Sequence, residues 1–123
     1  MKTEVDWKTS GACVSARDPD ESWKLAAFAD FRWFKQNGYI YELGESVEGA
    51  LKPVFKRVIE ICKGKGIKRL CIAAVPRPFS REEELCLLLG FKPADRIPLS
   101  VRREIQKTRF SAPYSVLVYQ IGG

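Results

Sequence analysis

The sequence predicts one α+β domain, in which a mixed, twisted sheet of about six or seven strands carries two main helices. First, residues 39–75 read as strand, loop, amphipathic helix and apolar strand, which is the order of a β-α-β unit. Second, residues 23–43 read as two strands joined at an Asn-Gly turn. Third, a chain of 123 residues that is 46% apolar is large enough for one hydrophobic core. We therefore expect residues 1–123 to form a single domain.

The N-terminal half is predicted to contain a long β-hairpin. Residues 23–34 alternate so that Phe31 and Trp33 share one face, and we expect that face to meet the core. The dipeptide Asn37-Gly38 tolerates two successive positive φ angles, which favours a two-residue type I′ turn at this position. Residues 39–43 then form the antiparallel return strand.

The β-α-β unit is predicted from a helix placed between two strands. Pro53 suits the first helical position, where its missing N–H costs nothing, and the helix runs to about Lys63, before Gly64. The apolar run at 68–75 fits a strand that is covered on both faces, which is typical of parallel pairing. The carboxyl ends of the two parallel strands mark the expected ligand site. The residues expected on the core-facing side of the helix are Val54, Phe55, Val58, Ile59 and Cys62.

A second helix is predicted after Ser80. Ser80-Arg81-Glu82-Glu83 matches a capping box, in which Ser80 caps the N–H of Glu83. Residues 85–89 are apolar all round, so we expect this helix to be deeply packed. Gly90 is the expected C-cap, and residues 91–94 start another strand.

The two ends of the chain and residues 95–113 give weaker patterns. Residues 1–11 are either a frayed start or an edge strand, and residues 12–17 predict a short strand. Residues 101–108 are either a short exposed helix or a mobile loop. Residues 114–121 have the composition of a final strand. If that strand is an exposed edge, it offers a surface for a homodimer.

Composition excludes several classes of site. The sequence contains no histidine, which removes histidine-based triads, histidine general bases and most zinc sites. The four cysteines form no C-x-x-C pair, so we expect no metal and interpret them as buried free thiols in a reducing cytoplasm. The N-terminus lacks the apolar run of a signal peptide, and no segment approaches the roughly 18 apolar residues of a membrane span. We therefore expect a cytoplasmic protein.

Two local motifs resemble those of the GNAT (Gcn5-related N-acetyltransferase) family. Leu85–Pro93, with the letters LCLLLGFKP, looks like the family's ending of the helix before its sixth strand. Gly66–Leu70 looks like the lead into its fifth strand. The resemblance covers about residues 24–121 and implies a GNAT-like fold. It also implies acyl transfer from acetyl-coenzyme A (acetyl-CoA) to an amine, with the pyrophosphate of coenzyme A held by the loop after the fourth strand.

That loop, residues 44–51, departs from the family's Gln/Arg-x-x-Gly-x-Gly/Ala signature. Gly49 is the one residue inside it that can play a glycine of the motif, and no Arg or Gln precedes it at the required spacing. Glu45 and Glu48 place negative charge where the pyrophosphate would lie, at a cost of about 1–4 kcal/mol per charge pair in a partly shielded site. The family's tyrosine general acid falls at Cys86, a thiol in an apolar helix.

The resemblance still assigns a set of candidate site residues. Glu42, on the fourth strand, is the candidate general base. The candidate cofactor-binding residues are Gly44, Gly49, Ala50 and Leu51.

The leading hypothesis is a diverged, non-catalytic GNAT-like domain that binds a partner protein and needs no cofactor. Ornithine decarboxylase antizymes, which bind another protein through a GNAT-like sheet without acetyltransferase activity, are similar in order and spacing over about residues 38–121. Tyr39–Leu43 and Leu88–Phe91 are the segments that carry this second resemblance.

Two alternatives remain. The first is an N-acyltransferase that uses acetyl-CoA and an amine, with Glu42 as its base. The second is a nucleic-acid-binding protein, since the net charge is +6 and basic residues gather at Lys63–Arg69 and Arg96–Arg109.

Overall fold

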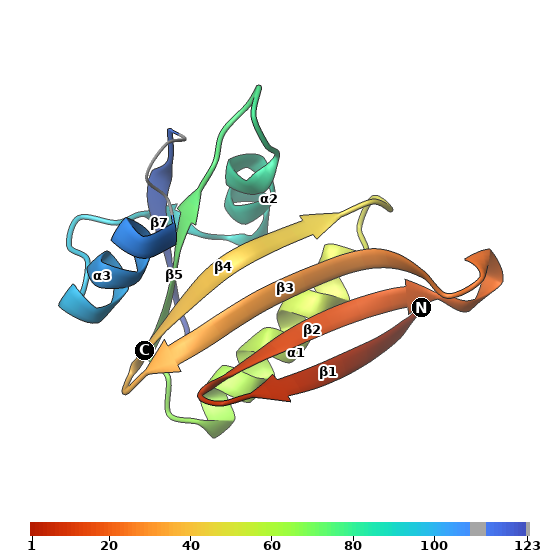
Figure 1. The fold of residues 1–123 in the computed structure, drawn as a ribbon, viewed down its shortest axis with the longest axis horizontal. Helices are drawn as coiled ribbons and strands as arrows, with labels where there is room; N and C mark the ends of the chain where they lie inside the picture. Colours follow the sequence, from red (N-terminus) through yellow and green to blue (C-terminus); the bar gives the residue numbers. More distant parts are fainter. Residues whose placement is uncertain (109–112, 123) are drawn as a thin grey trace.

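The computed structural model describes residues 1–108 and 113–122, and it contains one seven-stranded mixed sheet (Figure 1). The strand order across the sheet is β1-β2-β3-β4-β5-β7-β6. The predicted fold class is confirmed, and residues 1–11 hold an edge strand. In chain order the strands are β1 (Lys2–Lys8), β2 (Gly11–Asp18), β3 (Lys24–Phe34), β4 (Asn37–Glu45), β5 (Arg69–Ala74), β6 (Lys92–Pro93) and β7 (Ser115–Gln120).

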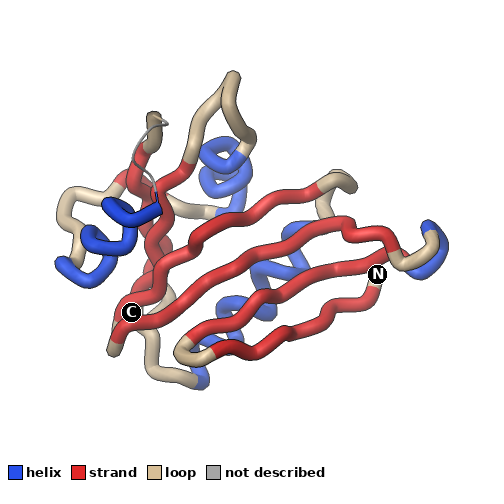
Figure 2. Tube along the Cα trace, in the orientation of Figure 1, coloured by secondary structure: helices blue, strands red, loops and turns tan. Residues whose placement is uncertain are grey.

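Helices cover both faces of the sheet. On one face, α1 (Leu51–Gly64) packs against β2, β3 and β4, and α2 (Glu82–Leu89) packs beside it against β4 and β5. On the other face, α3 (Leu99–Thr108) packs against β4, whereas β1, β2 and most of β3 are open (Figure 2). A 3-10 turn at Pro19–Glu21 joins β2 to β3. Of the alternatives for residues 101–108, the helix is confirmed; α3 is a third helix beyond the two main ones expected.

The β3–β4 hairpin is confirmed, but its turn lies two residues earlier than expected. Phe34 pairs with Asn37, so the two-residue loop is Lys35-Gln36, with Lys35 at a φ of 59°. Gly38 is instead needed for close packing, because a Cβ atom added to it would stand 2.7 Å from Leu70 Cδ1.

The parallel pairing of β4 with β5 is confirmed, and it is short. It begins at Asn37 opposite Arg69 and ends at Ile40 opposite Ile72. Asp30 of β3 pairs with Glu42, but the next residue, Phe31, pairs with Ile40. Tyr41 is therefore the extra residue of a β-bulge in β4. Beyond this point β4 continues beside β3 alone, and the carboxyl ends of β4 and β5 diverge (Figure 1).

The main core lies between α1 and the sheet. The predicted stripe on α1 is confirmed, although the helix begins at Leu51, two residues before Pro53. Phe31 is fully buried there, and Trp33 packs against the same cluster, as expected. A second core forms on the opposite face, where Val101 and Ile105 of α3 cover the strands β4 and β5.

The predicted capping box of α2 is wrong. The Ser80 hydroxyl accepts from the N–H of Glu82 at 3.2 Å, while the buried Glu82 carboxylate accepts from the N–H of Val75 at 3.1 Å. Glu82 therefore ties the start of α2 to the end of β5. The expected deep packing is also only half right: the core-facing side of the helix is buried, but Leu87 and Leu88 are exposed. Gly90 is the C-cap, with a φ of 104°.

The final strand is not the edge of the sheet. β6 pairs with β7 at Val118 and Leu117, and β5 pairs along its other side. The expectation that β7 offers a homodimer edge is therefore wrong, and β1 is the long edge strand.

Arg109, part of one predicted basic segment, lies outside the described residues. Across residues 1–108 and 113–122, no helix has the length and apolar character needed to cross a membrane.

Replacing Gly38 by Ala is expected to lower the free energy of unfolding by about 1–3 kcal/mol, because the new Cβ crowds the fully buried Leu70. Urea unfolding followed by tryptophan fluorescence measures the change. Gly64→Ala is the matched control, since no atom lies within 4 Å of its added Cβ and the position is helical. The control is expected to unfold at an equal or higher urea concentration. Equal losses in both variants would contradict the assigned packing.

Candidate functional site

A groove of about 270 Å³ opens where β4 and β5 diverge, between the β4–α1 loop and α2. Leucine side chains of α2 give it an apolar wall. Two exposed cations, Lys52 and Arg81, stand at its border. The residues that line it are Glu45, Glu48, Gly49, Leu51 and Lys52 on one side and Arg81, Leu85, Leu88 and Leu89 on the other.

A carboxylate of the chain itself occupies the N-terminus of α1. Glu45 Oε2 accepts a hydrogen bond from the backbone N–H of Leu51 at 3.0 Å. Ala50, the N-cap residue, supplies no side-chain hydrogen bond. The first turn of a helix has unpaired donors and a partial positive charge, which together favour an anion. Glu45 therefore satisfies a donor that a bound phosphate would otherwise take.

The loop before α1 is held in place from β3. Ser46 donates from Oγ to the carbonyl of Leu25 at 2.8 Å and from its backbone N–H to Ala26 at 2.8 Å. The N–H of Ala50 bonds the carbonyl of Val47 at 3.0 Å. Gly49 adopts a φ of 85°, a conformation that favours glycine, and its Cα faces open space.

The structure gathers only part of the predicted cofactor-binding set at this groove. Gly49 and Leu51 line it, and the buried Ala50 lies between them in the chain. Gly44 is instead inside β4, paired with Phe28. Sequence reasoning missed Arg81 and the leucines of α2, because no local pattern shows which loop a helix will face.

The candidate base Glu42 lies outside this groove, on the open face of the sheet. Its carboxylate is exposed, and it aligns across the strands with Asp30, Cys13 and Asp6. Glu42 lines a shallow depression formed by the ends of β3 and β4. Glu45 borders both this depression and the groove, so the two hollows are neighbours.

The bulge residue Tyr41 fastens α3 to the sheet. Its hydroxyl donates to Glu104 Oε2 at 2.5 Å, and the Tyr39 hydroxyl lies 3.2 Å from Thr108 Oγ1. Burial, and then the hydrogen bond to Glu104, raise the pKa of Tyr41. Its proton therefore stays on the phenol at neutral pH, and the arrangement is a structural clamp.

Cys86 is buried inside α2, as expected. Burial, with a smaller contribution from the nearby Glu82, raises the pKa of this thiol well above its ordinary value. A buried neutral thiol is a poor proton donor to a leaving group in the groove. Within the part of the chain that the structure describes, no group of three or more acidic or cysteine side chains is arranged to hold a metal.

Comparison with known proteins identifies the fold. The chain matches N-acetylglutamate synthase from Neisseria gonorrhoeae, solved with coenzyme A and N-acetyl-glutamate, with a TM-score of 0.67, 18% identity, and coverage of 93% of this chain and 26% of that one. Tetrahymena Gcn5 matches with a TM-score of 0.63, 15% identity, and coverage of 94% and 71%. A GNAT-family acetyltransferase from Elizabethkingia anophelis, solved with acetyl-CoA, matches with a TM-score of 0.61, 16% identity, and coverage of 90% and 76%.

These likenesses show that the chain has a GNAT-like fold. At such identities they show the fold alone. The chain spans about a quarter of the length of the N-acetylglutamate synthase. No protein-family model matches the sequence, and no curated protein is found to be related to it.

In native protein at pH 8, iodoacetamide is expected to alkylate Cys13 alone, because it is the only one of the four described thiols that is not buried. Burial raises the pKa of Cys62 to about 12 and that of Cys71 to about 11, which leaves almost no thiolate in either. Burial and Asp30 also raise the pKa of Cys13, so its reaction should be slow. The intact mass of the native wild-type protein should show one addition, and that of native Cys13→Ser should show none. The wild-type protein unfolded in urea should show four. Alkylation of Cys86 in the folded protein would contradict its inert role.

Proposed function

We propose that this domain binds an acyl-CoA in the groove between the β4–α1 loop and α2 and transfers the acyl group to an amine. The observation that carries the proposal is the position of the groove, at the diverging ends of β4 and β5 and beside the N-terminus of α1. The likeness to acetyltransferase structures with bound coenzyme A or acetyl-CoA supports it.

The groove has part of the chemistry that coenzyme A requires. Lys52 and Arg81 bring positive charge to its border, and Leu85 and Leu88 bring apolar surface to its wall. Glu45 opposes the phosphates, so its carboxylate would have to turn away from the N–H of Leu51 on binding. Coenzyme A is therefore expected to bind more weakly than it would to the same groove without the Glu45 carboxylate.

We assign Glu42, which lines the depression next to the groove, the role of base for the acceptor. In the transfer, the amine nitrogen forms a bond to the thioester carbonyl, the C–S bond breaks, and the amine loses a proton. Glu42 takes that proton, directly or through a water, from an amine that approaches over the open face of the sheet. We assign no side chain as the acid for the departing sulfur, which leaves as a thiolate and is protonated by solvent.

Replacing Glu45 by Gln is expected to tighten coenzyme A binding about fivefold or more, because it removes one negative charge beside the pyrophosphate. The amide oxygen of Gln keeps an acceptor for the N–H of Leu51. Titration calorimetry with coenzyme A and acetyl-CoA measures the dissociation constants. Glu21→Gln, on the 3-10 turn after β2, is the control with the same charge change. Equal constants for the two variants would refute the role of Glu45.

Replacing Glu42 by Gln is expected to lower turnover at least ~100-fold and to leave the affinity for acetyl-CoA unchanged. Release of free thiol, followed against a panel of primary amines, measures turnover. Glu4→Gln, on the exposed edge strand β1, is the control. Unchanged turnover in Glu42→Gln would remove Glu42 as the base.

A second function, binding of a partner protein without catalysis, is favoured by two observations. The N-terminus of α1 is already occupied by Glu45, and two large apolar side chains stand out near α2: Phe79 is 69% exposed and Leu88 is 79% exposed. The resemblance to the antizymes, which stays a prediction, agrees with this reading.

A ligand at ~100 times its dissociation constant should raise the melting midpoint by several degrees. No shift with 1 mM acetyl-CoA, in either wild type or Glu45→Gln, would favour this second function.

A further inference from the structure

One end of the molecule, far from the groove, is strongly basic. We define the basic end by five exposed cations, which come from the β3–β4 turn, from the connection between α1 and β5, and from the first residue of β5. They are Lys35, Lys63, Lys65, Lys68 and Arg69. Among the described residues, none of the five forms an ion pair with a carboxylate.

Backbone hydrogen bonds join the turns of the basic end into one platform. The N–H groups of Lys68 and Arg69 both point to the carbonyl of Gln36, at 2.8 and 3.4 Å. The N–H of Ile121 bonds the carbonyl of Lys68 at 2.9 Å. The cations are thus carried by a fixed backbone, and only their side chains need to be ordered when a ligand binds.

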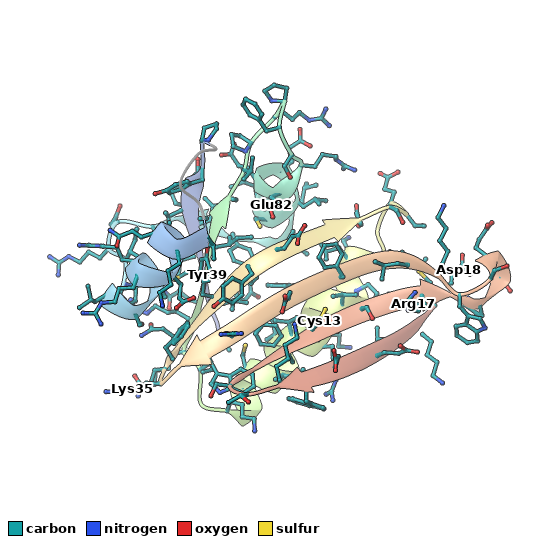
Figure 3. All side chains as sticks on the ribbon, viewed as in Figure 1. Cys13, Arg17, Asp18, Lys35, Tyr39 and Glu82 are labelled. Atoms are coloured by element: carbon teal, nitrogen blue, oxygen red, sulfur yellow. The ribbon has the colours of Figure 1, made fainter. Side chains whose placement is uncertain are left out.

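Carboxylates are absent from the chain segments that build this end. Residues 7–17, 31–41 and 61–81 contain no Asp or Glu. The opposite end holds the acidic 3-10 turn after β2 and the acidic loop before α1. Figure 3 shows this separation, with Lys35 at one end of the molecule and Asp18 at the other. The basic end therefore carries five positive charges with no carboxylate in these segments, which favours a polyanionic partner.

Aromatic side chains stand among these cations. Trp7, on the edge strand β1, is 54% exposed. The Nζ atom of Lys65 lies 5.9 Å from the ring centroid of Trp7 and 5.7 Å from that of Trp33. An exposed indole within a cluster of lysines is a combination that suits single-stranded nucleic acid, because a base can stack on the ring while the ammonium groups neutralise phosphates.

We propose that the basic end binds single-stranded nucleic acid, with phosphates on the five cations and one base stacked on Trp7. The surface lies at the end of the sheet away from the acyl-CoA groove, so the proposal does not depend on the proposed function. The exposed arginines of α3 lie on the opposite face of the sheet from α1, which makes them a separate surface and a source of matched controls.

Binding of a fluorescein-labelled dT20 strand, measured by anisotropy at 25–200 mM NaCl, tests the proposal. If all five cations contact phosphates, the slope of log affinity against log salt should be about −3.5, a loss of about 100-fold between 50 and 200 mM. The triple variant Lys63→Glu/Lys65→Glu/Lys68→Glu should lose at least tenfold at 50 mM and show a flatter slope. The control Lys92→Glu/Arg102→Glu/Arg103→Glu makes the same charge change at exposed positions elsewhere and should bind nearly as the wild type does.

Trp7→Ala should weaken binding about five- to hundredfold with an unchanged salt slope, and Trp7→Tyr should restore most of the affinity. Circular dichroism confirms that each variant is folded. Three results would overturn the proposal: affinity that is flat with salt, an equal loss in the two triple variants, or anionic lipid vesicles that bind as tightly as dT20 with no effect of Trp7→Ala.

Discussion

The short parallel contact between β4 and β5 is the constraint on which the rest of this structure depends. It holds only from Asn37 to Ile40, where Gly38 leaves room for the buried side chain of Leu70. Once the contact ends, β4 follows β3 and β5 follows β7, so the sheet opens on its carboxyl side. The opening is filled on one side by α2, which Glu82 ties to the end of β5. The groove is the remainder of that opening.

The same opening decides what the groove can bind. In this fold the start of α1 points into the gap, and a helix start attracts anions. Here the Glu45 carboxylate accepts a hydrogen bond from the N–H of Leu51, so a side chain of the protein already occupies part of the anion-binding position. Under the proposed function, coenzyme A would have to compete with this internal carboxylate, while the positive charges of Lys52 and Arg81 would favour its binding. The balance between these charges separates the acyltransferase from the protein-binding alternative.

Charge is also divided along the long dimension of the sheet. The acidic groups near the groove and the basic end lie at opposite ends of the strands, because strands that run the length of the sheet carry their turns to its two extremes. A small domain can in this way present two chemically distinct surfaces, with a rigid core between them. Buried residues on both faces of β4 and β5 supply that rigidity.

The sequence by itself determined the elements: the long hairpin, the amphipathic α1, the apolar β5 and the glycine that ends α2 all follow from local periodicity and backbone preference. It also located the unusual acidic loop through Glu45 and Glu48. Only the tertiary structure decided that Glu45 caps α1, that Arg81 and Leu88 face that loop, and that β7 lies inside the sheet. It alone brought Gln36 of the β3–β4 turn against Lys68 and set Trp7 near Lys65. These outcomes depend on which surfaces meet across long separations in the chain, and periodicity carries no information about such contacts.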